Sequence, residues 1–292
     1  MFKGAITAIV TPFSNGEVDW KSFENLVKFQ IKNGIDGIVP CGTTGESATL
    51  SYDEHNKVVE MTVKIVSKKV PVIAGTGANS TEEAIELTEH AKKVGADASL
   101  QVTPYYNKPT QEGLYRHFKK IAEGVDIPII LYNVPGRTGV NLLPETVVRL
   151  SKIPNIVGIK EASGNINQVT EICKEVKKKN FSVLSGDDAL TLPILAVGGK
   201  GVISVASNII PAKVSKLVAL YLMGETEKAV KLHYELYTLM QTLFIETNPI
   251  PVKTALYLMG MIKNEFRLPL CEMSENNVSK LKKILSDYKL IK

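Results

Sequence analysis

The chain has 292 residues, of which 44% are hydrophobic and 22% are charged, and its formal net charge at pH 7 is +5. These values are typical of a globular protein with a large apolar core, and the mild, scattered charge does not favour a nucleic-acid-binding surface. The one basic run, Lys177–Lys179, falls at an expected helix end, where the helix dipole stabilises cations.

The three cysteines, Cys41, Cys173 and Cys271, lie far apart and form neither a disulfide framework nor a CxxC metal site. Their use favours a reducing compartment, and we expect the cytoplasm. Pro12 breaks the N-terminal apolar stretch too early for a signal peptide, and no run of about 18 apolar residues predicts a membrane span.

Short β-branched runs alternate with segments of helical period through the first three-quarters of the chain. Eight of these runs are predicted as strands: residues 4–10, 37–41, 70–75, 98–103, 127–133, 155–160, 181–186 and 201–205. Glutamates follow Ser51 and Ser80 at the spacing of a capping box, as Glu54 and Glu83. From Gly224 onward only helical patterns remain, over residues 225–247, about 250–262 and 274–288.

Eight strand–helix units fit between residue 4 and about residue 223, and such alternation implies a parallel sheet. The predicted fold is therefore an α/β protein with a (β/α)₈ barrel over residues 1–224 and a C-terminal helical appendage over residues 225–292. A doubly wound open sheet is the alternative, but no GxGxxG motif follows the first strand.

A lysine, Lys160, ends the apolar strand at 155–160, where an unpaired ammonium would be costly if it were buried. It is either a solvated strand-end residue or an amine that an apolar site holds neutral. Side-chain alternation places Lys160 and Tyr132 on inward faces of neighbouring strands. A neutral amine beside a phenol can attack a ketone and form a Schiff base.

Two further strand-end segments offer anion-binding groups. The turn Gly42–Gly45 can direct successive backbone N–H groups at a carboxylate, although such turns also occur as ordinary loops. Arg137, one of four arginines, follows a Pro–Gly turn and either binds a carboxylate or clamps its loop. Asp187 and Asp188 could hold a divalent ion, but helix capping is the favoured interpretation.

Other catalytic patterns are missing. The four histidines form no HExxH motif or close pair, and there is no GxSxG elbow, so neither a metal site nor a serine hydrolase is expected. The glycine-rich turn at 42–45 has no lysine at the Walker-A position, so it is not predicted to bind a nucleotide. No cofactor is predicted.

Several long motifs occur in order along the chain: CGTTGESATL, TPYYNKPTQEGL, YNVPGRTG, GIKEASG, LSGDD, GVISV and ETNPIPVK. Together they resemble the dihydrodipicolinate synthase (4-hydroxy-tetrahydrodipicolinate synthase) family, of the class I pyruvate-dependent aldolase and lyase superfamily. The resemblance implies a Schiff-base condensation of pyruvate with L-aspartate 4-semialdehyde in lysine and diaminopimelate biosynthesis, without metal or nucleotide.

The resemblance also implies roles for individual residues. Lys160 would form the imine, Tyr132 would transfer protons, and Thr43 and Tyr106 would complete a hydroxyl relay, with Tyr106 lent across a subunit interface. The remaining substrate-binding positions are Thr44, Ile203 and Gly186 for pyruvate and its surroundings, and Arg137 for the semialdehyde carboxylate.

The resemblance further implies a homotetramer, built as a dimer of dimers, and a lysine effector site at a dimer interface. The matching positions are Ser47, Ala48, Tyr52, His55, Asn79, Glu83 and Tyr105. Inhibited bacterial members often have histidine where this chain has Tyr52, so the sequence leaves lysine inhibition open.

Two alternatives to the synthase activity are also open. One is another pyruvate aldolase, of the N-acetylneuraminate lyase or 2-keto-3-deoxygluconate aldolase type, acting on a sugar-like aldehyde. The Gly136–Arg137 pair and the sequence Gly42-Thr43-Thr44 favour the synthase over these relatives. The other is a barrel that binds pyruvate or lysine without catalysis.

Overall fold

The computed structural model describes residues 1–292, and its central feature is an eight-stranded parallel barrel. Each strand pairs with the next along the chain, and the last pairs with the first. Between β4 and β5 the contact narrows to a bridge from Ile38 to Val72. The barrel strands are β1 (Gly4–Ala8), β4 (Gly37–Val39), β5 (Ile73–Gly75), β6 (Ala98–Val102), β7 (Ile129–Asn133), β8 (Ile156–Glu161), β9 (Ser182–Ser185) and β10 (Gly201–Ser204).

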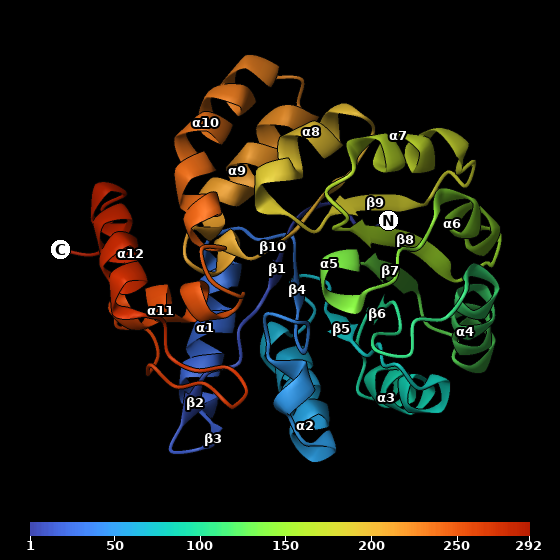
Figure 1. Ribbon diagram of the computed structural model, residues 1–292, viewed down its shortest axis with the longest axis horizontal. Helices are drawn as coiled ribbons and strands as arrows, with labels where there is room; N and C mark the ends of the chain where they lie inside the picture. The colour runs from blue at the N-terminus through green and yellow to red at the C-terminus, as the bar shows by residue number, and fades with distance from the viewer.

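Helices surround the barrel, as Figure 1 shows. They are α1 (Trp20–Lys32), α2 (Tyr52–Val66), α3 (Thr81–Lys93), α4 (Gln111–Gly124), α5 (Pro135–Thr138), α6 (Pro144–Ser151), α7 (Ile166–Glu175), α8 (Thr191–Ala196) and α9 (Pro211–Leu222). Three short 3₁₀ helices, η1 (Ser47–Thr49), η2 (Asp188–Leu190) and η3 (Ala206–Asn208), lie in strand-end loops. The predicted (β/α)₈ barrel is confirmed.

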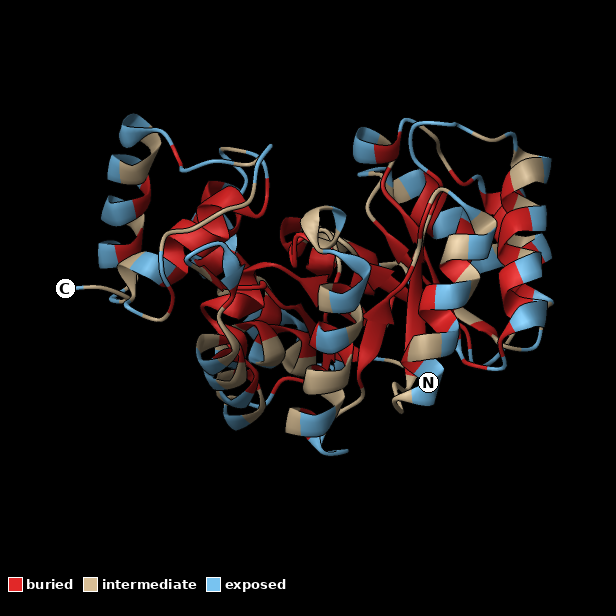
Figure 2. Cartoon of the chain, turned by 90° about the horizontal axis from the view of Figure 1, so that it is seen from below, coloured by how far each residue is buried: buried red, intermediate tan, exposed pale blue.

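The apolar core has an inner and an outer part. Ile6, Ile73, Leu100, Ile130 and Leu184 fill the barrel interior with other strand residues, and all are at most 3% exposed. Two larger clusters lie between the strands and the helices. In Figure 2 the barrel strands are almost entirely buried, while the helices expose their outer faces.

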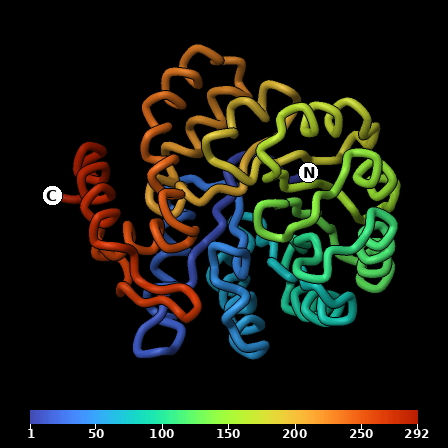
Figure 3. The backbone as a smooth tube through the Cα atoms, viewed as in Figure 1, coloured from blue at the N-terminus to red at the C-terminus, as the bar shows by residue number.

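The C-terminal helices pack on the barrel and share its outer core. They are α10 (Thr226–Thr242), α11 (Ile250–Leu258) and α12 (Glu275–Asp287), and Leu236 and Leu281 belong to the same cluster as Ile9. Figure 3 shows the C-terminal segment beside the hairpin of β2 (Phe13–Ser14) and β3 (Glu17–Val18). There the Asn15 amide donates to Glu265 at 2.8 Å.

Two local predictions need correction. The helix expected over residues 225–247 ends at Thr242, because the next residues turn back toward the barrel although their apolar pattern continues. Ser51 and Glu54 form a complete capping box. Ser80 caps α3, but the Glu83 side chain does not return to it, so only half of the second box exists.

Candidate active site

The carboxyl ends of β7 and β8 bring the predicted lysine and tyrosine together. Their register pairs Tyr132 with Lys160, and each is only 6% exposed. The Lys160 amine lies 4.2 Å from the centroid of the Tyr132 ring. No carboxylate forms an ion pair with this amine. The interpretation of Lys160 as a solvated strand-end residue is therefore wrong.

Gly186, which follows β9, gives the lysine its space. A Cβ at this position would lie 2.7 Å from Cβ of Ala162, closer than folded proteins allow, and 3.0 Å from Cε of Lys160, a contact that the lysine chain would have to relieve by shifting. The Gly186 amide donates to the Glu161 carbonyl at 2.8 Å, which holds the loop against the end of β8. A side chain here would displace either the loop or the amine.

The loop after β4 offers free backbone amides. The amides of Gly45 and Glu46 donate to carbonyls of the same loop, at 3.0 and 3.1 Å, and fold it into a tight turn. The amides of Thr43 and Thr44 make no hydrogen bond within the chain. Adjacent free N–H groups of this kind bind anions such as carboxylates, as the sequence predicts for this turn.

Asn248, in the loop between α10 and α11, joins two of the predicted binding residues. Its Nδ2 donates to the Thr44 hydroxyl at 3.1 Å, and its carbonyl accepts from the Arg137 guanidinium at 2.9 Å. Asn248 is 5% exposed, and its Oδ1 has no partner. Sequence reasoning assigned it no role. Its signal was its place in the motif ETNPIPVK, a Pro-rich segment between two predicted helices.

Arg137 lies in α5, in front of the barrel strands in Figure 1. Its side chain is exposed, and it makes no ion pair, so most of its guanidinium is available to a ligand. The two roles weighed for this residue are thus compatible, because one nitrogen bonds Asn248 while the others remain free.

A buried ion pair supports the Thr43–Thr44 turn from behind. Lys253 of α11 pairs with Glu46, and both side chains are at most 1% exposed. The Lys253 amine also lies 4.3 Å from the Phe13 ring and 4.9 Å from the Phe266 ring. Burial lowers the pKa of Lys253, and the Glu46 charge opposes that change. Sequence reasoning missed this pair, although a lysine among the apolar residues of IPVKTALYL was a signal.

Asp187 and Asp188 act as caps, in line with the favoured interpretation. Asp187 caps η2 through the Ala189 amide at 2.8 Å. Asp188 is buried and accepts from the Val205 and Ala206 amides, both at 2.9 Å, and from Ser204. It therefore fixes the segment directly after Ile203, which is itself fully buried in β10.

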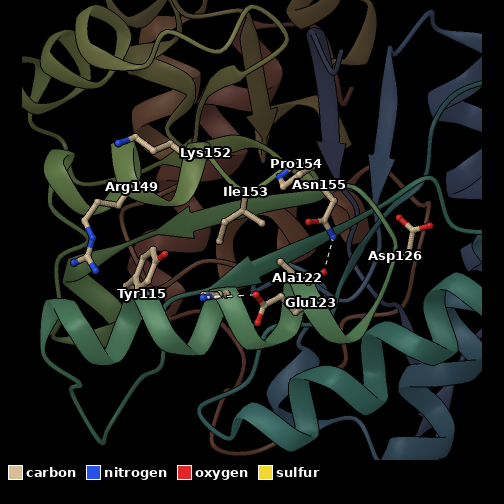
Figure 4. A pocket seen from close by; sticks show the side chains of 10 residues that line it. Tyr115, Ala122, Glu123, Asp126, Arg149, Lys152, Ile153, Pro154 and Asn155 are labelled. Carbon is tan, nitrogen blue, oxygen red and sulfur yellow. Dashed lines mark hydrogen bonds and ion pairs between the residues drawn. The ribbon is translucent and has the colours of Figure 1, made fainter.

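Thr43, Arg137 and Asn248 line a cavity of about 560 Å³ that extends from the strand ends toward α2 and α3. A second hollow lies between α4 and α6 (Figure 4). It includes Pro154 and Asn155, which precede β8 and so mark the opposite end of the barrel from Lys160. Barrel enzymes use the carboxyl ends of their strands, so the candidate site is at the end where the first cavity lies. Lys160 and Tyr132 are at the same end of the barrel but do not line this cavity.

Comparisons with known proteins identify the family. A model of the dihydrodipicolinate synthetase family matches residues 1–288. The chain belongs to this family.

Members of the synthetase family match over the full chain. A 4-hydroxy-tetrahydrodipicolinate synthase of Thermodesulfovibrio yellowstonii is 61% identical over 292 residues and covers 100% of both chains. The structure of dihydrodipicolinate synthase from Aquifex aeolicus has 54% identity and a TM-score of 0.97, with 99% of each chain covered. A family structure from Cyanidioschyzon merolae, described as having lysine bound, has 44% identity and a TM-score of 0.96, again with 99% of each chain covered.

Tyr106 and Thr43, the two residues predicted to complete the hydroxyl relay, form no hydrogen bond with Lys160 or Tyr132 in the single chain. Tyr106 is 90% exposed, has a φ of 71°, and does not line the cavity, whereas Tyr105 does. Thr43 lines the cavity but makes no hydrogen bond to Tyr132. The geometry of one chain thus contains the amine, the phenol and the anion-binding turn, but not the whole relay.

The predicted effector positions lie mainly at the other end of the same cavity. Ser47, Ala48, Tyr52, His55, Glu83 and Tyr105 line it, whereas Asn79 only donates to the Tyr105 carbonyl at 3.2 Å. The nearby Glu83 carboxylate raises the pKa of Tyr52 to about 12. Burial lowers the pKa of His55, whose Nε2 donates to the Gly75 carbonyl at 2.8 Å.

The structure contains no group of three or more His, Cys, Asp or Glu side chains that could hold a metal ion. None of its helices combines the length and the apolar character that crossing a membrane requires.

Proposed function

We propose that this chain is a lyase that condenses pyruvate with L-aspartate 4-semialdehyde to 4-hydroxy-tetrahydrodipicolinate, in lysine and diaminopimelate biosynthesis. The observation that carries the proposal is the buried Lys160 amine, unpaired and 4.2 Å from the Tyr132 ring. The full-length similarity to synthases of this name supports the choice of substrates. The three free cysteines are in keeping with a cytoplasmic enzyme.

The chemistry begins at Lys160. Its neutral amine adds to the ketone carbon of pyruvate, and loss of water leaves an imine. Removal of a methyl proton gives an enamine, whose carbon attacks the aldehyde carbon while the aldehyde oxygen takes up a proton. The amino group of the second substrate then attacks the imine carbon, which closes the ring and frees Lys160. Tyr132 is the nearest group for these proton transfers.

The carboxylates of the two substrates require separate partners. The free amides of Thr43 and Thr44, with the Thr44 hydroxyl, suit the pyruvate carboxylate, and the Ile203 backbone and Gly186 complete its surroundings. Arg137 suits the carboxylate of the semialdehyde, because a guanidinium can donate two parallel hydrogen bonds to it. A hydroxyl relay through Thr43 and Tyr106 would connect Tyr132 with solvent.

A second subunit would complete this relay. The exposed Tyr106 ring, held in a left-handed backbone conformation, suits donation to a neighbouring chain. We therefore place the enzyme in a homotetramer built as a dimer of dimers, with residues 1–224 as the catalytic barrel and residues 225–292 as a helical domain. Lysine is the candidate effector at the Tyr52–Glu83 end of the cavity, by analogy with the lysine-bound relative.

Reduction with borohydride tests the central step. In the presence of pyruvate, an imine on Lys160 should be reduced to a stable adduct that intact-mass and peptide analysis place on this residue, and Lys160→Met should show none. A barrel that only binds pyruvate gains no adduct. If the adduct forms but pyruvate is consumed with a sugar-like aldehyde and not with aspartate semialdehyde, the aldolase alternative is correct.

A further inference from the structure

A network of buried amides and one carboxylate lies behind the candidate lysine and tyrosine. Asn133 and Glu161 directly follow Tyr132 and Lys160, and they are paired in the same β7–β8 register. Because side chains alternate along a strand, this pair lies on the outer face of the barrel wall while the reactive pair lies on the inner face. Asn133 is fully buried and Glu161 is 1% exposed.

The Glu161 carboxylate receives only N–H donors. The Ser163 amide donates to Oε1 at 2.7 Å, Gln168 Nε2 donates to Oε2 at 3.0 Å, and Asn133 Nδ2 lies 3.3 and 3.2 Å from the two oxygens. No lysine, arginine or histidine forms an ion pair with it. A buried anion without a cation is costly, so these hydrogen bonds must hold it.

Backbone groups fix the direction of every hydrogen bond in this network. The Leu142 amide donates to Asn133 Oδ1 at 2.9 Å, so Asn133 must turn its NH₂ group toward Glu161. The same NH₂ group donates to Asn141 Oδ1 at 2.7 Å, and Asn141 Nδ2 donates to Gln168 Oε1 at 2.8 Å. Turning the side-chain amide of either Asn133 or Asn141 by 180° would place one N–H donor against another.

The network connects four separate segments. Asn133 and Glu161 belong to the ends of β7 and β8, Asn141 to the segment between α5 and α6, and Gln168 to the first turn of α7. Glu161 accepts from Asn133 of β7 and from Gln168 of α7, as well as from the Ser163 amide that follows its own strand. Since β7 and β8 carry Tyr132 and Lys160, a shift in this network moves the two reactive groups relative to each other.

We infer that Glu161 is a positioning residue. It sets the spacing of Lys160 and Tyr132 through this network, in which each hydrogen bond can have only one direction. The inference rests on the proposed imine chemistry at Lys160. Glutamine in its place must direct an NH₂ group at Ser163 or at Gln168, and both already donate. The strand ends would then separate, although shape and volume are nearly unchanged.

The test compares Glu161→Gln with a charge-swapped double variant, Glu161→Gln with Gln168→Glu. In the double variant the glutamine at 161 can accept from Ser163 and donate to the glutamate at 168, which still accepts from Asn141 Nδ2, so the contact between the two positions again pairs a donor with an acceptor. Asn141 Oδ1, which accepts from Gln168 Nε2 at 3.2 Å in the parent, loses that donor. Glu171→Gln, on the exposed face of α7, removes the same charge outside the network and serves as the control.

We expect Glu161→Gln to slow imine formation with pyruvate, and kcat with it, by roughly tenfold or more, because small displacements of reacting groups have large effects on rate. The melting temperature and the KM for pyruvate should change little. The double variant should recover part of the lost rate, because the contact between positions 161 and 168 again pairs a donor with an acceptor. Glu171→Gln should resemble the parent throughout.

Unchanged rate constants in folded Glu161→Gln would overturn the inference. So would failure of both variants to fold, which would mean that the network acts on stability alone. Absence of any adduct in the parent chain would instead overturn the proposed function.

Discussion

At the scale of single residues, the candidate site depends on space and on hydrogen-bond direction as much as on reactive groups. The Lys160 amine can lie over the Tyr132 ring because Gly186 has no side chain. The Thr44 hydroxyl accepts from Asn248, so its own proton is free to donate to a ligand. The sequence motifs identified the reactive groups, but not Asn248, because its partners come from distant parts of the chain.

Replacing Gly186 with alanine should block the amine. The new methyl group would meet Cε of Lys160 at 3.0 Å, so we expect borohydride trapping with pyruvate to slow by about tenfold or more, as for a displaced reacting group. Gly136→Ala is the matched control, because nothing lies within 4 Å of the Cβ it would add. Equal trapping rates in the two variants would contradict the assigned role.

Replacing Arg137 with alanine should separate the two substrates. Loss of a charged hydrogen bond costs about 1.5–3 kcal/mol, so kcat/KM for aspartate semialdehyde should fall by roughly 10- to 100-fold. Imine formation with pyruvate, measured by trapping, should change much less. Arg149→Ala, on the far side of the barrel, is the control. An equal loss in both measurements would remove Arg137 from the acceptor site.

At the scale of helices and strands, local patterns predicted most of the barrel and failed where tertiary contacts decide. All eight strands were identified, because a fully buried parallel strand has a clear β-branched signature. The helix predicted to residue 247 stops at Thr242, since Asn248 is held by Thr44 and Arg137. Glu83 had the spacing of a capping residue, but its side chain does not return to the N-terminus of α3 and instead lines the cavity with Tyr52.

The contact between α3 and α4 predicts a pH effect on stability. His117 of α4 bonds Thr81 at 2.9 Å, and burial lowers its pKa from 6.5 to about 4. The unfolded chain therefore binds a proton between these pH values that the folded chain does not, and stability is lost as the pH falls from about 6.5 to about 4. The loss should be on the order of 3 kcal/mol.

Denaturant unfolding of the parent and of His117→Gln at several pH values measures this effect. The difference in unfolding free energy between the two should be constant above pH 7 and should shift in favour of the variant as the pH falls toward 4. A difference that does not change with pH would show that His117 does not cause the acid sensitivity.

At the scale of the whole molecule, the helical tail and the barrel form one functional unit. Lys253 reaches Glu46, and Arg267 binds Glu54 of α2 and donates to the Thr49 carbonyl at 3.0 Å. The division at residue 224 predicted from the sequence falls directly after α9, the helix that follows the last strand, but the bonds that hold the Thr43–Thr44 turn cross it. Only the folded chain reveals such pairs, because they are more than 200 residues apart.

Replacing Lys253 with methionine should leave the Glu46 carboxylate buried and unpaired, which costs about 3–5 kcal/mol of folding free energy. Adding Glu46→Gln removes that charge, so the double variant should recover part of the lost stability. Denaturant unfolding measures both, with Lys263→Met, at an exposed position, as the control. No recovery in the double variant would contradict a buried ion pair.

The crossing bonds also affect biosynthesis of the protein. The ribosome finishes every barrel strand before it adds Asn248, Lys253 and Arg267. A nascent chain can therefore close its sheet and bury Lys160 while the Thr43–Thr44 turn, which we propose binds pyruvate, still lacks its contacts with Asn248 and Lys253. We expect catalytic activity only after the final segment packs on the barrel. A chain that ends before Asn248 should therefore fold in large part but have no activity.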